Sequence, residues 1–445
     1  MSNEHKFGTI SDSDHLFTVP TTNVKEQKSV SLFYIWFAAN LTIGDFAIGF
    51  IPVSLGQPVY PSIIALTIGN ITGGLLLAAM SVTGVLTRKP QMALSFGPFG
   101  RAGASVMSLL QWGNTLGWLT VNLVLAAFAL DIIMGGVNFI LPIAVVAIVV
   151  LVLAFYGHEA IRKFELAMSV SLGILFLAIS MEFLFRSGSI SYSPVPVIPV
   201  LSGFGITLAS SFSYLMAWGP YAADYSRFVR GRKEKSRSFY FTFLGGVVAS
   251  FWIELLGMGV AIATADSIAN PATALAGFMG GYFAIGMIAL FMGGIAANAI
   301  NLYSNGLSLN TVLARTGMKL PVFIGTIASV VLGIIGYYNF YSFYEIFLLI
   351  LDYWITPWLG ILIIHYFYIQ RRAGNGTVAV RKFSGISSYC LAILASVPFM
   401  SPPAYFVGPI AALFNGVDIS YYVSFLLAAV FYAVLNSQRT FNKTG

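Results

Sequence analysis

Residues 209–228 read ASSFSYLMAWGPYAADYSRF, and this stretch indicates what kind of protein the chain forms. It lies in an apolar segment that begins after Pro199 and is long enough to cross a bilayer. The middle of the segment is a poor membrane helix, because three serines precede Gly219 and Pro220, and proline removes a backbone donor. Backbone groups freed inside lipid must be satisfied by protein or by a water-filled cavity. An interrupted membrane helix of this kind is typical of a transporter site.

The composition places the chain among membrane proteins. Of its 445 residues, 58% are hydrophobic and 9% are charged, whereas soluble domains carry about 25% charged residues. The mean hydropathy of +0.84 indicates several membrane spans. The single cysteine, Cys390, excludes an intramolecular disulfide. Residues 1–30 are polar and lack the apolar core of a signal peptide, so they predict a short, loosely ordered cytoplasmic tail.

Twelve apolar segments follow this tail, and we predict that each forms a transmembrane helix. The fold class is therefore an all-α polytopic membrane protein in the lipid bilayer. The segments cover residues 32–54, 61–86, 102–131, 137–156, 160–185, 200–226, 238–264, 281–308, 319–337, 343–369, 383–402 and 417–437.

The basic residues predict the orientation. With the N-terminus inside, all of the 23 Lys and Arg residues except Arg186 fall in the N-terminal tail, the cytoplasmic loops or the C-terminus. This distribution is the positive-inside pattern. It predicts a plasma-membrane protein with both termini in the cytoplasm. It also accounts for the net charge of +7, which otherwise would suggest a nucleic-acid partner.

The first span, residues 33–56, is interrupted like the sixth. It reads FYIWFAANLTIGDFAIGFIPVSLG and places Gly44 and Asp45 at its centre. An ionised aspartate costs about 2.5–3.5 kcal/mol at that depth, so Asp45 should face a cavity or a partner. Because the two broken spans are five apart, we predict two inverted five-helix repeats. The predicted units are a tail (1–30), the two repeats (31–185 and 186–372), and two further helices with a short tail (373–445).

Polar side chains share one face of the third span and one face of the eighth, which are equivalent in the two repeats. Their spacings of three and four residues put them on one side of a helix. We interpret the two faces as the walls of one polar cavity, although amides also hold membrane helices together. The residues are Gln111, Thr115, Trp118 and Asn122 in the third span and Asn298, Asn301 and Asn305 in the eighth.

Two further acids, Glu254 and Asp352, lie inside predicted spans. Each could relay protons, or could pair with a hydroxyl or backbone group. The sequence has no His or Cys cluster with metal-ligand spacing, no Walker loop and no G-x-S-x-G elbow. We therefore predict no metal, no cofactor and no enzymatic activity.

Five stretches resemble the nucleobase:cation symporter family, on its purine-cytosine permease side. The resemblance extends over spans 1 to 10 and implies twelve helices, with inverted repeats in which helices 1 and 6 are broken. The stretches are WFAANLTIGDFAIG (36–49), SFGPFGRAG (95–103), LGWLTVN (116–122), WGPYAADYSRF (218–228) and ANAINLYSNGLSL (297–309).

The resemblance also implies a substrate site. In that family a base is held between an aromatic residue of helix 3, here Trp118, and one of helix 6, here Phe212 or else Trp218. Other side chains contact the edge of the base. In this chain they correspond to Ser211 and Ser213 of helix 6, Asn298 or Asn301 of helix 8, and Thr115 with Asn122 of helix 3.

Rings, amides and hydroxyls without a fixed charge suit a planar neutral heterocycle. We therefore predict import of cytosine, a purine or a related ring by symport with H⁺ or Na⁺. The expected cation-coupling residues are Asp45, Gly44 and Glu254, although Asp45 could instead bond the unwound backbone. Residues 293–301, GGIAANAIN, have no hydroxyl before Asn298 to bind Na⁺, which favours H⁺. The alternatives are an amino-acid or amine:cation symporter of the same architecture and, with less support, a channel or a membrane enzyme.

Overall fold

The structure, a computed structural model, is helical throughout its described part except for one bridge between Gln27 and Val229. The described residues are 27–136, 138–189, 191–231, 233–264, 270–313, 317–336, 340–373, 380–381, 383–402 and 406–437. The helices are α2 (Val30–Asn40), α3 (Ile43–Ile48), α4 (Phe50–Ser54), α5 (Val59–Thr87), α6 (Phe96–Ile133), α7 (Ile140–Phe155), α8 (Gly157–Arg186), α9 (Val200–Met216), α10 (Ala222–Ser226), α11 (Glu234–Ala263), α12 (Pro271–Met279), α13 (Phe283–Leu313), α14 (Lys319–Gly336), α15 (Phe340–Ile363), α16 (Gln370–Ala373), α17 (Ser384–Ser396), α18 (Pro409–Leu413) and α19 (Ser420–Asn436).

Each predicted span coincides with one of these helices or with consecutive helices, the first span with α2, α3 and α4. Among the described residues, eight helices are long and apolar enough to cross a membrane, and the bent pair at the start of the chain would make nine. Three more apolar helices, α7, α17 and α19, are shorter. Large aliphatic side chains such as Ile148 and Ile174 are more than half exposed, as expected of a surface that faces lipid.

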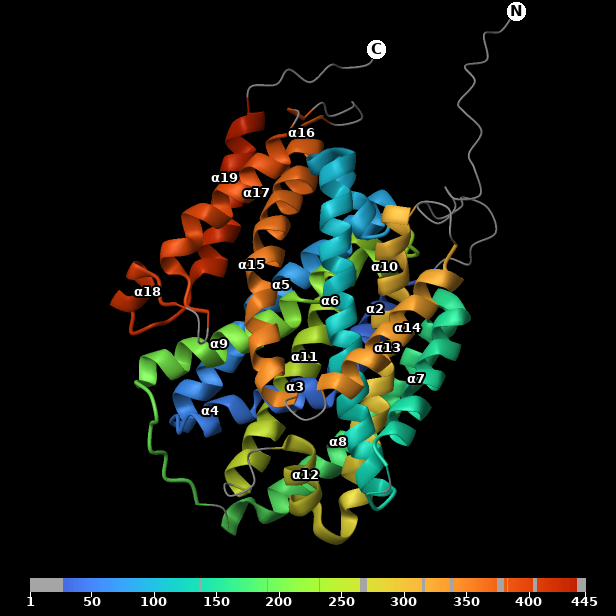
Figure 1. Ribbon diagram of the computed structural model, residues 1–445, viewed down its shortest axis with the longest axis vertical. Helices are drawn as coiled ribbons and strands as arrows, with labels where there is room; N and C mark the ends of the chain where they lie inside the picture. Colours follow the sequence, from blue (N-terminus) through green and yellow to red (C-terminus); the bar gives the residue numbers. More distant parts are fainter. Residues whose placement is uncertain are drawn as a thin grey trace, which may run out of the picture.

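The bundle is centred on α6 and α13, the third and eighth predicted spans, which pack along each other (Figure 1). Helix α9 packs on α5, and α11 packs on both α2 and α5. Glycines permit these close contacts: a Cβ on Gly69 of α5 would lie 2.7 Å from the Leu208 carbonyl oxygen of α9. Helices α17 and α19 lie outside this core against α15 (Figure 1).

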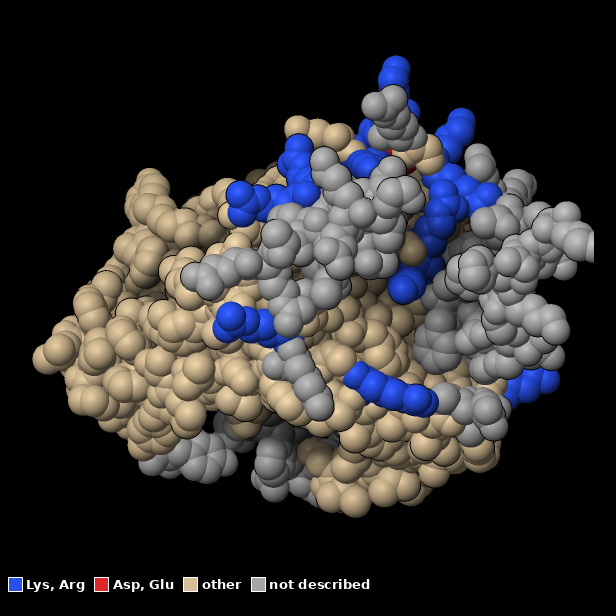
Figure 2. Space-filling view, turned by 90° about the horizontal axis from the view of Figure 1, so that it is seen from above, with Lys and Arg blue, Asp and Glu red and all other residues tan. Residues whose placement is uncertain are grey.

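Basic side chains gather at one end of the bundle, which we call the basic end. Figure 2 looks onto this end, at the top of Figure 1, and shows many Lys and Arg side chains with little acidic surface. The predicted tail is tied down here from Gln27 onward, since the Ser29 backbone N–H donates to Glu234 Oε2 at 2.9 Å. Residues 1–26, for which we predicted a loose tail, lie outside the described residues.

Candidate functional site

The first predicted span unwinds within the membrane, just before its glycine and aspartate. Helix α2 ends at Asn40 and α3 begins at Ile43, and the helices on the two sides of the break are inclined by 56°. Thr42 has an extended backbone and caps α3, because its hydroxyl accepts a hydrogen bond from the Asp45 N–H at 3.2 Å. The carbonyl of Leu41 points at α13, where a Cβ on Gly293 would lie 2.1 Å from the oxygen.

Trp118 lies at the centre of a group of aromatic rings. Its ring centroid is 5.4 Å from Tyr214 of α9, 5.4 Å from Phe347 of α15 and 6.3 Å from Tyr344, all in edge-to-face geometry. Two of these rings are held by the broken helix: the Tyr344 hydroxyl donates to the Gly44 carbonyl at 2.8 Å, and the Tyr214 hydroxyl bonds Thr42 at 2.7 Å. The rings thus connect α6, α9 and α15 to the start of α3.

Phe212 and Trp218, the two helix 6 aromatics that the sequence suggested as partners of Trp118 around the base, have their ring contacts with other residues. Phe212 packs on Tyr421 and Tyr422 of α19, with ring centroids 5.3 and 5.1 Å away. Tyr214, two residues further on, meets Trp118 instead, because residues two apart on a helix point about 200° apart. Trp218 follows α9, and its indole N–H donates to Asn40 Oδ1 at 2.9 Å.

The amide-bearing faces of α6 and α13 lie against each other, and some of the amides join the two helices directly. Asn298 donates to the Leu119 carbonyl at 3.0 Å, and Asn305 donates to the Thr115 hydroxyl at 2.8 Å. Thr115 in turn donates to backbone carbonyls of its own helix. Asn298, Thr115 and the amide N–H of Asn305 therefore bond within the helix interface, which is the alternative role considered for such residues. The carbonyl oxygen of Asn305 is buried without a partner and lies next to Gly325 of α14.

Several buried amide carbonyls in the described part of the chain have no hydrogen-bond partner, and those of Asn122 and Asn301 are the ones that bear on the predicted substrate site. Asn122 donates to the Trp118 carbonyl at 3.1 Å, and Asn301 donates to Asn298 at 3.2 Å. Within the described part of the chain, the Oδ1 atoms of Asn122 and Asn301 are buried without a hydrogen-bond partner. The first is 3.7 Å from the Cβ position of Gly44, so it lies at the break of the first span. Buried acceptors without a partner are costly, which makes them candidates for ligand contacts.

Two buried carboxyl groups lie side by side behind this break. Asp45 of α3 faces Ser250 and Glu254 of α11. Glu254 Oε2 accepts a hydrogen bond from the Ser211 hydroxyl at 3.0 Å and a short one from the Asn70 amide. The cluster joins α3, α5, α9 and α11, and all five side chains are fully buried.

The remaining predicted polar residues of span 6 fall on two sides of α9. Ser211 belongs to the carboxyl cluster and also receives a hydrogen bond from Asn70 at 2.8 Å. Ser213 lies against Asp352 of α15, which is likewise buried. The sequence analysis did not single out Asn70, Tyr214 or Tyr344. Asn70 is a lone amide in the second predicted span, and this was the only sequence signal for any of the three.

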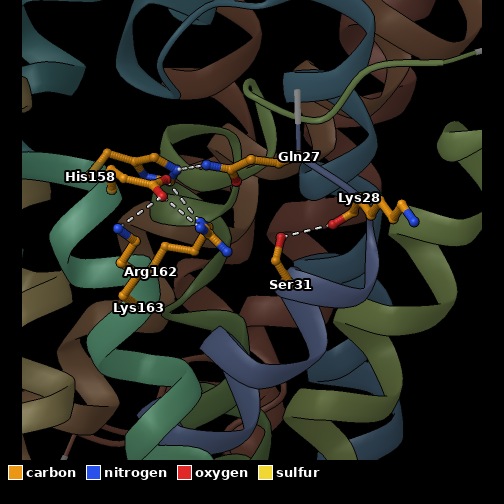
Figure 3. Close-up of polar contacts among 7 residues, drawn as sticks. Gln27, Lys28, Ser31, His158, Arg162 and Lys163 are labelled. Atoms are coloured by element: carbon orange, nitrogen blue, oxygen red, sulfur yellow. Dashed lines mark hydrogen bonds and ion pairs between the residues drawn. The ribbon is translucent and has the colours of Figure 1, made fainter. Parts of the chain in front are cut away.

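At the basic end, Gln27, the first described residue, contacts both α8 and the loop after α10. Gln27 Nε2 is 2.8 Å from His158 Nε2 (Figure 3), and the Gln27 N–H donates to the Phe228 carbonyl at 3.3 Å. His158 stacks on Phe228 with ring centroids 3.8 Å apart. Beside this contact, Arg162 pairs with Glu159 at 2.6 Å (Figure 3). Segments far apart in the sequence are thereby held together at this end.

Known proteins identify the family. The model of the family described as "Permease for cytosine/purines, uracil, thiamine, allantoin" matches residues 18–424. The chain belongs to this permease family. A putative purine-cytosine permease of Bacillus subtilis, YxlA, is 27% identical in an alignment 438 residues long that covers 94% of this chain and 94% of that protein. The purine-cytosine permease fcyB of Emericella nidulans is 28% identical in an alignment 452 residues long that covers 92% of this chain and 86% of that protein.

A solved structure has the same fold. Mhp1, a nucleobase-cation-symport-1 family transporter with bromovinylhydantoin bound, aligns with a TM-score of 0.76 at 19% identity, over 93% of this chain and 92% of that one. The relatives confirm the predicted family, and they confirm that the chain is a multi-span permease rather than an enzyme. The family and the fold support a nucleobase transporter.

Proposed function

We propose that the protein is a secondary active importer that couples entry of a nucleobase, cytosine or a purine, to movement of H⁺ down its gradient. Twelve membrane-crossing helices, arranged as two inverted five-helix repeats and two additional helices, carry the transport cycle. The cytoplasmic placement of both termini rests on the gathering of Lys and Arg at the basic end.

The observation that carries the proposal is that Asn122 Oδ1 of α6 and Asn301 Oδ1 of α13 are buried without a partner where these two helices pack, and that Asn122 lies one helical turn after Trp118. A nucleobase offers ring faces to an indole and N–H donors to amide carbonyls. The neighbouring groups are rings, amides and hydroxyls, which suit a neutral ring better than an amino acid with two charges. In this proposal Trp118 stacks on the base, Tyr214 and Tyr344 line the site, and the two carbonyls accept its N–H groups.

We assign coupling to Asp45 and Glu254. Two adjacent carboxylates in a buried site repel each other, so the pair favours holding a proton. Asp45 lies one residue after Gly44, whose carbonyl is bonded by Tyr344 beside Trp118. A change of protonation at Asp45 would therefore alter the contacts of the base by shifting the short helix α3. The facing segment of α13 offers glycine and alanine next to Leu41 rather than hydroxyls, which supports H⁺ over Na⁺.

Alternating access requires the basic end to open and close. The contacts of Gln27 and His158 would have to separate when the site opens toward the cytoplasm (Figure 3). They join the N-terminal segment, α8 and the loop after α10, so their loss would free three elements at once. A single side-chain hydrogen bond contributes about 0.5–1.5 kcal/mol, which is small enough for a reversible gate.

The test is an uptake panel in proteoliposomes that compares cytosine, adenine, hypoxanthine, allantoin and leucine, each with and without H⁺ and Na⁺ gradients. Accumulation of a nucleobase under a proton gradient alone is the expected result. Accumulation of leucine but of no heterocycle would instead identify an amino-acid carrier of this architecture.

A further inference from the structure

A hollow lies at the basic end, and none of the predicted substrate-site residues lines it. Its volume is about 860 Å³, and it lies between the end of α5, the start of α11 and the segment from the π-helical turn Ile364–Ile369 into α16. Lys89, Lys235 and Arg371, one from each of these three parts, line it. A cavity of this size accommodates a phosphate-bearing headgroup with room for water.

Among the described residues, no acid forms an ion pair with the cations of this hollow. The ion pairs between described residues involve Glu159, Glu182 and Glu234, and none includes Lys89, Lys235 or Arg371. The N–H groups of the first turn of α11 also point toward this end and carry partial positive charge, and the acid of that turn, Glu234, is bonded to Ser29 and Arg237. Three cations and a helix N-terminus converge here from separate elements.

The surroundings of the hollow indicate where an anion comes from. On α11, Ser236 lines the hollow, and Tyr240, Leu244 and Val248 follow at intervals of four residues, which places all of them on one stripe of the helix. Their exposed fractions are 62%, 45% and 47%. Leu86 of α5, which also lines the hollow, is 40% exposed. An apolar track therefore leads from the hollow down the outside of the bundle, where lipid chains lie.

We propose that this hollow binds the phosphate headgroup of an anionic phospholipid from the leaflet at the basic end. Lys89, Lys235 and Arg371 contact the phosphate, and the acyl chains follow the stripe from Tyr240 to Val248. A soluble phosphate would satisfy the cations but leave the stripe unused, which is why the geometry favours the lipid.

The proposal is tested by native mass spectrometry of the full-length protein, titrated with dioleoylphosphatidylglycerol or dioleoylphosphatidylcholine. Each nearby cation contributes about 1 kcal/mol, or roughly fivefold, to binding of an anionic lipid, and three contribute at most about 150-fold. The parent protein should therefore prefer phosphatidylglycerol. A Lys89→Gln, Lys235→Gln, Arg371→Gln triple variant should lose that preference.

The matched control removes three exposed charges elsewhere at the same end, with Arg101→Gln, Lys163→Gln and Arg372→Gln. It should keep the lipid preference of the parent. An equal loss in the control, or none in the test variant, overturns the proposal. The proposal would also be overturned if glycerol 3-phosphate raised the unfolding temperature as much as phosphatidylglycerol does. The hollow would then bind a soluble phosphate rather than a lipid headgroup. A conservative Lys89→Arg, Lys235→Arg, Arg371→Lys variant that binds like the parent excludes misfolding as the cause.

Discussion

Replacing Trp118 by alanine should weaken nucleobase binding far more than replacing Phe212, although both rings are buried. Stacking of a base on an aromatic side chain contributes about 1–3 kcal/mol, so Trp118→Ala should raise the dissociation constant about 5- to 150-fold. The same change also removes the edge contacts with Tyr214, Tyr344 and Phe347. Loss of a large buried ring costs about 3–5 kcal/mol of stability, so a destabilised protein could mimic a lost contact.

Phe212→Ala is the matched control for that loss of packing. Phe212 is 2% exposed and Trp118 is 5% exposed, and each packs on several rings. Both alanine variants should therefore lower the unfolding temperature, but only Trp118→Ala should change the affinity measured by equilibrium binding of radiolabelled cytosine and purines. Trp118→Phe should retain much of the binding. Equal losses of affinity in the two alanine variants would refute the reasoning and favour the sandwich of Trp118 with Phe212.

Asn298 and Asn301 of α13 should respond differently to replacement by leucine. Asn301→Leu removes a carbonyl that can accept a hydrogen bond from the base, so it should reduce affinity about 5- to 150-fold, the range for about 1–3 kcal/mol. Asn298→Leu breaks a hydrogen bond to α6, so it should chiefly lower the unfolding temperature. Binding assays and thermal unfolding of both variants check this, and the reverse pattern would exchange the roles of the two residues. In a Cys390→Ser background, a cysteine introduced by Ser236→Cys should be shielded from impermeant thiol reagents in sealed right-side-out vesicles, and labelling without permeabilisation would contradict the orientation.

The break in the first span could be predicted from the sequence, because its signals are local. The Gly44-Asp45 pair lies two residues after the observed unwinding at Leu41 and Thr42. The sixth span, Val200–Ser226, instead stays helical through its serines and changes to a 3₁₀ turn only near its end. In the sixth span, Pro220 lies in the short 3₁₀ segment Gly219–Tyr221 between α9 and α10. Proline and glycine act on their own backbone, so their effect is visible without the fold.

The partners of the central rings could not be predicted in the same way. Tyr344 bonds the carbonyl of Gly44 across 300 residues, and only the packing of α15 against the other helices brings the two together. The rotation of α9, which decides that Tyr214 rather than Phe212 meets Trp118, depends on the glycine contacts between α5 and α9. Spacing places side chains on a face, but it does not say which face meets the site.

The most direct test of the account is to compare binding and accumulation in one Asp45→Asn preparation. Asparagine keeps the size of the side chain and cannot carry the proton, so the variant should bind the nucleobase in an equilibrium assay. The variant should also fail to concentrate the nucleobase in proteoliposomes under an inward proton gradient. Uptake by the parent should collapse with a protonophore and ignore Na⁺. An Asp45→Asn variant that still concentrates substrate, or a parent whose uptake depends strictly on Na⁺, would contradict coupling through the Asp45–Glu254 pair.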